Sequence, residues 1–266
     1  MVHFLGVAGL AFAALLTIFC SLRWPFLSRI LLVAFVVRMF AAVFNSHIGS
    51  LPGSDSDAVT FERYAWEWAQ GGFIQALQQF TGPDSYFISW IISLLYAVTD
   101  RSLLMAQSVS LMFGMGTVVI GSLIAKEIWG LRAAVKASWL LALFPTLILY
   151  SALVMREAYI WFFVLIALYG VALWARNGNL RYALLAVSGF LAATFFHGAM
   201  FLGAIFFLIY VTARSLKHFC FGIAQKKSGQ VRHCLFSVLR FPFLFISLQT
   251  SAFRNSVLSS KLQIRK

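Results

Sequence analysis

Long apolar runs follow one another along most of this chain and are separated by short polar linkers. They cover residues 4–21, 30–45, 86–98, 103–125, 137–154, 158–175, 182–196 and 199–213, and a weaker ninth run covers residues 235–250. A helix needs about 20 predominantly apolar residues to cross a bilayer, and most of the runs approach that length. The pattern therefore predicts an all-α integral membrane protein with about seven to nine transmembrane helices.

Basic residues occur in every second linker once the run 86–98 is set aside. They are Arg23, Arg29, Lys126, Arg132, Lys136, Arg176, Arg181, Arg214 and Lys217. Because cytoplasmic loops are rich in Lys and Arg, we expect these linkers in the cytoplasm and residues 155–157 and 197–198 on the outer face. The run 86–98 would make only about 20 Å of helix, against a hydrocarbon core of about 30 Å. It is interpreted as a re-entrant or partly embedded helix, with a tilted span as the alternative.

A polar, acidic stretch interrupts the apolar pattern in the predicted external loop, residues 46–85. Its acids are Asp55, Asp57, Glu62 and Glu67. Pro52 and Gly53 predict a turn, and the residues that follow predict a helix over 56–70 that stops at Gly71 and Gly72. One side of this helix carries Ala58, Phe61, Tyr64, Ala65, Trp68 and Ala69, and the other carries Thr60, Arg63, Glu67 and Gln70. Such an amphipathic helix between membrane segments is expected to lie in the interface.

The composition supports a membrane protein and excludes an ordinary soluble domain, since 61% of the residues are apolar and the mean hydropathy is +0.87. The net charge of +13 comes from residues that lie between apolar runs. It indicates topology, and we expect no nucleic-acid partner. Residues 1–213 are predicted to form the membrane domain, with 4–21 as a retained helix, and 214–266 a basic cytoplasmic tail. Cys20, Cys220 and Cys234 have no metal or redox spacing.

Asp55 and Asp57 flank Ser56 near the predicted start of the interfacial helix. The ordinary explanation is helix capping, because Ser and Asp are common there. The alternative is a functional pair of carboxylates beside the lipid headgroups. A phosphate could share that position, because the backbone N–H groups of a helix N-terminus favour anions.

The same stretch resembles the GT-C superfamily, the polytopic glycosyltransferases that include protein mannosyltransferases and aminoarabinose transferases. An acidic residue, an aromatic, a small residue and a glycine stand at the family's spacing in Asp57, Phe61, Ala65 and Gly72. The segment 86–90, and the segment from Leu143-Phe144-Pro145 through 151–158, resemble later parts of the family pattern, which covers about residues 30–213. Asp84-Ser85 stand where many members carry a lysine before prolines, and the chain is shorter than such relatives.

The resemblance implies an enzyme of the cytoplasmic membrane that moves a sugar from a polyprenyl-phosphate donor to a hydroxyl acceptor on a glycan, lipid or protein. Asp57 would be the general base, and Asp55 would support it or bind a metal. The substrate-binding candidates are Arg156, Glu157, Arg101, His197 and Tyr86. Arg156 or Arg101 would meet the donor phosphate in place of the lysine. Glu157 would orient Arg156 or join Asp57 on a divalent cation, a metal dependence that the sequence leaves open.

Most of these candidates also have a structural interpretation. Arg156 and Glu157 form a charged pair at the end of an apolar run, which is typical of an orientation anchor. His197 lies in an outer turn, where it would either be an ordinary interfacial residue or line the acceptor cleft. Arg38 lies inside the second apolar run, where a cation faces protein or a polar cavity and either pairs structurally or contacts substrate.

Two other classes of protein fit part of the pattern. A transporter or flippase for lipid-linked saccharides would carry charged residues in several spans near the bilayer midplane. A non-catalytic membrane subunit that holds a partner enzyme would fit the short chain. The concentration of acids on one predicted face favours the enzyme, whereas the sugar and the acceptor are not encoded in any motif.

Overall fold

The described part of the chain is helical, and no strand occurs in it. The structure is a computed structural model that describes the backbone of residues 2–221 and the side chains of residues 4–213. The predicted segment 235–250 and most of the predicted tail lie outside the described residues. The longer elements are α1 (Val2–Arg23), α2 (Ser28–His47), α3 (Val59–Ala69), α4 (Gly72–Gln78), α5 (Phe87–Thr99), α6 (Leu103–Trp129), α7 (Leu131–Leu143), α8 (Pro145–Ala152), α9 (Arg156–Asn177), α10 (Leu180–Phe196) and α11 (Phe201–Phe221).

Several helices are long and apolar enough to cross a membrane. Four pass by length and composition: Phe4–Arg23, Pro25–His47, Leu103–Trp129 and Arg156–Asn177. Helices α7 and α8 meet at a bend of 56° and make a fifth candidate when they are taken together. Helices α5 and α10 and the first part of α11 are shorter apolar helices. The protein is thus an all-α, multi-pass membrane protein, and the predicted number of seven to nine spans is not confirmed.

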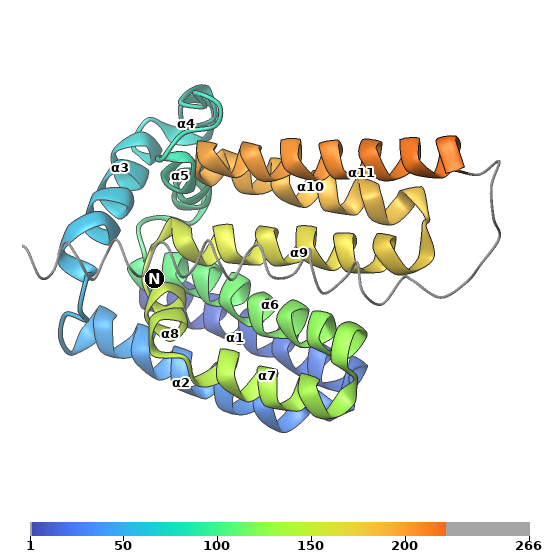
Figure 1. Ribbon diagram of the computed structural model, residues 1–266. Coiled ribbons are helices and arrows are strands. Elements are labelled where there is room, and N and C mark those ends of the chain that lie inside the picture. Colours follow the sequence, from blue (N-terminus) through green and yellow to red (C-terminus); the bar gives the residue numbers. More distant parts are fainter. Residues whose placement is uncertain (1, 222–266) are drawn as a thin grey trace, which may run out of the picture. The chain divides into compact units, whose positions relative to one another are not determined.

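The two ends of the bundle in residues 2–213 carry opposite charge. Helices α3, α4 and α5 gather at one end of the long helices (Figure 1), where the connections α8–α9 and α10–α11 also lie. We call this the acidic end, because all of the chain's acids except Glu127 belong to it: Asp55, Asp57, Glu62, Glu67, Asp84, Asp100 and Glu157. The basic end holds Arg23, Arg29, Lys126, Arg132, Lys136, Arg176 and Arg181. This is the alternation that the positive linkers predict.

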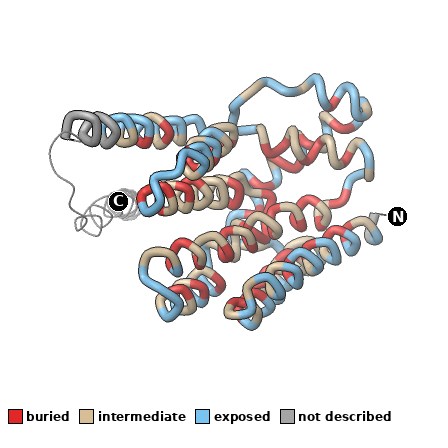
Figure 2. The backbone as a smooth tube through the Cα atoms, turned by 90° about the vertical axis from the view of Figure 1, so that its right-hand side faces the viewer, coloured by how far each residue is buried: buried red, intermediate tan, exposed pale blue. Residues whose placement is uncertain are grey.

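The long helices bury one side and expose the other (Figure 2). The exposed side carries many large apolar side chains. Phe4, Leu22 and Phe40 are exposed to 73%, 76% and 66%, which is the composition of a lipid-facing surface. Between α9 and α10 the contact is made by glycines. A Cβ atom on Gly189 would lie 2.6 Å from the backbone nitrogen of Ala167, so only glycine allows these helices to approach so closely.

Arg38 in the middle of α2 is fully buried and completes the interrupted end of α7. Pro145 has no N–H to donate to the carbonyl of Leu141, and the bend also removes a partner from Ala142. Arg38 Nη1 donates to the Ala142 carbonyl at 2.7 Å, and Nη2 donates to that of Leu141 at 3.0 Å. A cation at a helix C-terminus is also favoured by the helix dipole. The structural interpretation of Arg38 therefore accounts for its place in the bundle.

Replacing Arg38 with Met should destabilise the bundle, because two buried carbonyls would lose charged donors. We expect a loss of about 2–4 kcal/mol in unfolding free energy. Arg29→Met, an exposed site on the same helix, is the matched control and should change little. The measurement is thermal unfolding of the detergent-solubilised protein. Equal stability of the two variants would show that the end of α7 does not depend on Arg38.

The acidic and basic ends should lie on opposite sides of the membrane. In a chain whose three cysteines are replaced by serine, Ser85→Cys should react with an impermeant thiol reagent on intact cells. Asn177→Cys should react only after permeabilisation. Both positions are exposed and belong to opposite ends. Reaction of the two positions from the same side would contradict the assignment.

Candidate functional site at the acidic end

Helix α3 begins later than the sequence predicts because the preceding turn is irregular. Gly53 has a left-handed backbone (φ 85°), and residues Ser54–Ala58 form a wide turn in which Ser56 is not helical. The regular helix therefore runs over Val59–Ala69, inside the predicted range 56–70. Its buried residues are Phe61, Glu62, Ala65 and Ala69, whereas Arg63 and Glu67 are exposed. The helix is amphipathic, as predicted.

Asp55 and Asp57 lie in this turn with exposed side chains. Asp55 Oδ1 accepts a hydrogen bond of 3.4 Å from the hydroxyl of Ser54. Neither carboxylate caps α3, whose N-cap residue is Ala58 and which has no side-chain cap. Within residues 4–213 the carboxylate of Asp57 accepts no hydrogen bond, so it is free to act on a ligand. The capping interpretation therefore does not explain these residues.

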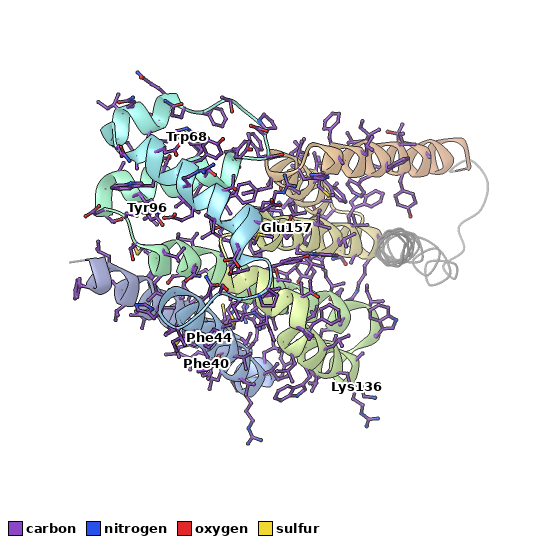
Figure 3. The ribbon with its side chains drawn as sticks, turned by 90° about the vertical axis from the view of Figure 1, so that its left-hand side faces the viewer. Phe40, Phe44, Trp68, Tyr96, Lys136 and Glu157 are labelled. Atoms are coloured by element: carbon purple, nitrogen blue, oxygen red, sulfur yellow. The ribbon has the colours of Figure 1, made fainter. Side chains whose placement is uncertain are left out.

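Arg156 and Glu157 occupy the first turn of α9, beside the start of α3. The Arg156 guanidinium lies 5.9 Å from the ring centroid of Phe61, a cation–π distance. Its Nε is 3.5 Å from Glu157 Oε1, and Glu157 Oε2 is buried without a partner among the described residues. Figure 3 looks onto the acidic end and places Glu157 near the start of α3. Since Phe61 follows Asp57 by one helical turn, the predicted base and the predicted phosphate ligand belong to the same region.

Arg101 is engaged by Glu62. Its Nε and Nη2 donate to the two carboxylate oxygens of Glu62 at 2.9 and 2.7 Å, and the hydroxyl of Tyr96 donates to Oε1 at 3.1 Å. The hydrogen bond to Glu62 raises the pKa of Arg101. Burial, followed by the charge of Glu62, raises the pKa of Tyr96, so the phenol stays neutral and donates. The Arg101 guanidinium also lies 5.8 Å from the ring centroid of Trp66.

Of the two remaining candidates, Tyr86 contacts the start of α3, whereas His197 does not. Tyr86 packs edge-on against Tyr64 and Phe61, with ring centroids 4.9 and 5.9 Å apart, so it shares a surface with the start of α3. His197 is exposed directly after α10. Its backbone N–H donates to the Ala193 carbonyl, and no side-chain contact in the described part of the chain joins it to the other candidates.

Comparisons with protein-family models, with curated proteins and with solved structures give no match. The resemblance to the GT-C superfamily thus stays a prediction that rests on the residues named above.

Glu62 is the functional candidate that the sequence analysis missed. Its spacing placed it on the buried side, four residues after Ala58 and three before Ala65. An acid on the apolar side of an amphipathic helix implies a buried cation partner, which is the signal that could have found it. Within the described residues no group of three or more His, Cys, Asp or Glu side chains could hold a metal ion.

Proposed function

We propose that this chain is a membrane glycosyltransferase that moves a sugar from a polyprenyl-phosphate donor to a hydroxyl acceptor at its acidic end. The observation that carries the proposal is the packing of Phe61 against Arg156. It places the guanidinium against a residue that follows the exposed carboxylate of Asp57 by one helical turn, at an end where apolar helices meet water. A lipid-linked donor brings its phosphate to that depth of the membrane.

The two groups have complementary roles in transfer. Asp57 takes the proton of the acceptor hydroxyl as its oxygen attacks the anomeric carbon of the sugar. The bond between that carbon and the phosphate oxygen breaks, and polyprenyl phosphate leaves with the bonding electrons. Arg156 stabilises the negative charge that develops on the phosphate. Asp55 supports Asp57 in the same turn.

Arg156 is better suited to the phosphate than Arg101. The planar fork of Arg101 is occupied by both oxygens of Glu62. In the described residues Arg156 makes one long hydrogen bond, through Nε, and this leaves its terminal nitrogens for a ligand. Glu157 orients Arg156, Tyr86 borders the same surface, and His197 is kept as a candidate on the acceptor side.

We also propose that the described helices cross the cytoplasmic membrane seven times, at the lower end of the predicted count. The crossings would be α1, α2, α6, the bent pair α7–α8, α9, α10 and α11. The close contact of α10 with α9 supports a return through the bilayer. This number leaves the acidic end outside and the basic linkers in the cytoplasm.

A transporter of lipid-linked saccharides is the second candidate, favoured by the broken pair α7–α8 and the buried Arg38. Transporters use discontinuous helices and buried charges as binding sites. Here, however, Arg38 already donates to the Leu141, Ala142 and Ala34 carbonyls. A guanidinium whose two terminal nitrogens are both bound is poorly placed to bind cargo, so the transferase is preferred. The non-catalytic subunit remains the outcome if the variants below leave transfer unchanged.

Asp57→Asn should lower transfer by about 100-fold or more, because it removes the base and keeps the size of the side chain. The assay follows transfer of a labelled sugar from a polyprenyl-phosphate donor in membranes. Asp84→Asn, an exposed acid in the same loop, is the control and should stay active. A dead Asp55→Asn beside an active Asp57→Asn would assign the base to Asp55, and activity in both would remove the proposed chemistry.

Arg156→Ala should weaken binding of polyprenyl phosphate about tenfold or more, and Arg156→Lys should keep part of the affinity because it retains charge without the planar fork. Arg63→Ala removes an exposed cation from α3 and is the control. Binding is measured with the lipid in detergent micelles. Unchanged affinity in Arg156→Ala would leave Arg156 without its proposed role.

A further inference from the structure

A glycine with a positive φ angle lies on each side of helix α3. Gly53 precedes it with φ 85° and Gly72 follows it with φ 83°. A Cβ atom at either position would meet nothing within 4 Å, so it is the backbone angle and not packing that favours glycine there. These two glycines mark the ends of the segment that carries α3.

The contacts of α3 with the bundle combine small and large apolar side chains with one charged group. Two of the four buried residues of α3 are alanines, Ala65 and Ala69. An alanine buries far less surface than a leucine or isoleucine, so each contributes little to holding the helix. Phe61 and the half-buried Trp66, which packs edge-on against Tyr96 with ring centroids 6.4 Å apart, are the large apolar residues of this side, and Glu62 is its charged one.

The residue next to Arg101, the partner of Glu62, has a strained backbone. Asp100 has φ 79° and ψ 166°, and among the described residues it is the one non-glycine with positive φ. This region is strongly disfavoured for a residue with a side chain. The Asp100 carboxylate accepts the backbone N–H of Arg101 at 2.7 Å, and the Asp100 N–H donates to the Tyr96 carbonyl at 2.8 Å. The turn thus fixes both donors that bind Glu62.

We propose that Glu62 is a positioning residue, whose ion pair with Arg101 holds α3 and thereby the turn that carries Asp57, one helical turn before the Phe61 ring that lies against Arg156. The Glu62 side chain is only 9% exposed, and a carboxylate left there without its cation would be driven toward water. Loss of the pair releases α3, whereas the long helices keep their own packing. The consequence for catalysis rests on the proposed transferase function, but the consequence for α3 does not.

The first test measures the position of α3 directly. In a cysteine-free background, Ala65→Cys reports on the buried side of α3, and Ala69→Cys is a second reporter. Labelling by a small thiol reagent is followed in detergent. Glu62→Gln should speed labelling about tenfold or more, and Arg101→Gln should do the same. The double variant should label no faster than either single one, because each removes the same interaction.

The matched control lies on the same helix. Glu67 pairs with Arg63 at 3.8 Å, with both side chains more than half exposed, so Glu67→Gln makes the same chemical change outside the buried pair. It should leave labelling unchanged. Equal labelling in Glu62→Gln and Glu67→Gln would overturn the proposal. Faster labelling of Ala134→Cys, which is buried in α7, would also overturn it, because the pair would then support the whole fold.

The second test uses transfer activity. Arg156 and its partner Glu157 both belong to α9, which keeps its packing in the bundle when α3 is released, so Glu62→Gln should lower kcat about tenfold or more and leave the KM for donor within about twofold. Arg101→Lys, which keeps the charge, should recover part of kcat. A rise in donor KM without a fall in kcat would contradict positioning of the base. If the unmodified chain transfers no sugar, the function fails and the labelling result still decides the role of Glu62.

Discussion

Inside a bilayer an interrupted helix has to be completed by the protein itself, because no water reaches its free carbonyls. The break between α7 and α8 depends on this condition, and Arg38 fulfils it from α2. With the carbonyls of Leu141 and Ala142 bound, the chain can bend by 56° and continue through α8 to the acidic end. Helix α8 then leads to α9, and Arg156 stands in the first turn of α9.

At the acidic end the opposite condition holds, since water is available and polar groups need no internal partner. The exposed carboxylates of Asp55 and Asp57 remain without strong partners there, whereas Glu62 in the same segment is fully bound. Only about one to two helical turns therefore separate a carboxylate that holds structure from carboxylates that are available to a ligand. Exposure, more than residue type, distinguishes the two roles.

The sequence predicted the parts of this protein that follow from local pattern. Apolar length placed the long helices, and amphipathic spacing placed α3 within a few residues of its observed range. Its start was missed because the left-handed Gly53 and the non-helical Ser56 depend on how the loop meets the bundle. The partner of Arg38 lies 104 residues away, and that of Glu62 lies 39 residues away. The periodicity of a single segment does not encode such distant pairs. The position of Glu62 on the apolar side of α3 does, however, imply a buried cation as its partner.

The sequence distance between Arg38 and its partners has a consequence for the synthesis of the protein. The ribosome adds about 5–20 residues per second, so the 104 residues from Arg38 to Ala142 take about 5–20 s to appear. During that time the carbonyls of Leu141 and Ala142, to which Arg38 will donate, have not yet been synthesised. We expect the nascent helix to keep Arg38 near a headgroup or within the insertion machinery until α7 emerges, because an intramembrane cation without its partners is costly. Release of α2 into lipid would then be coupled to the arrival of a helix made much later.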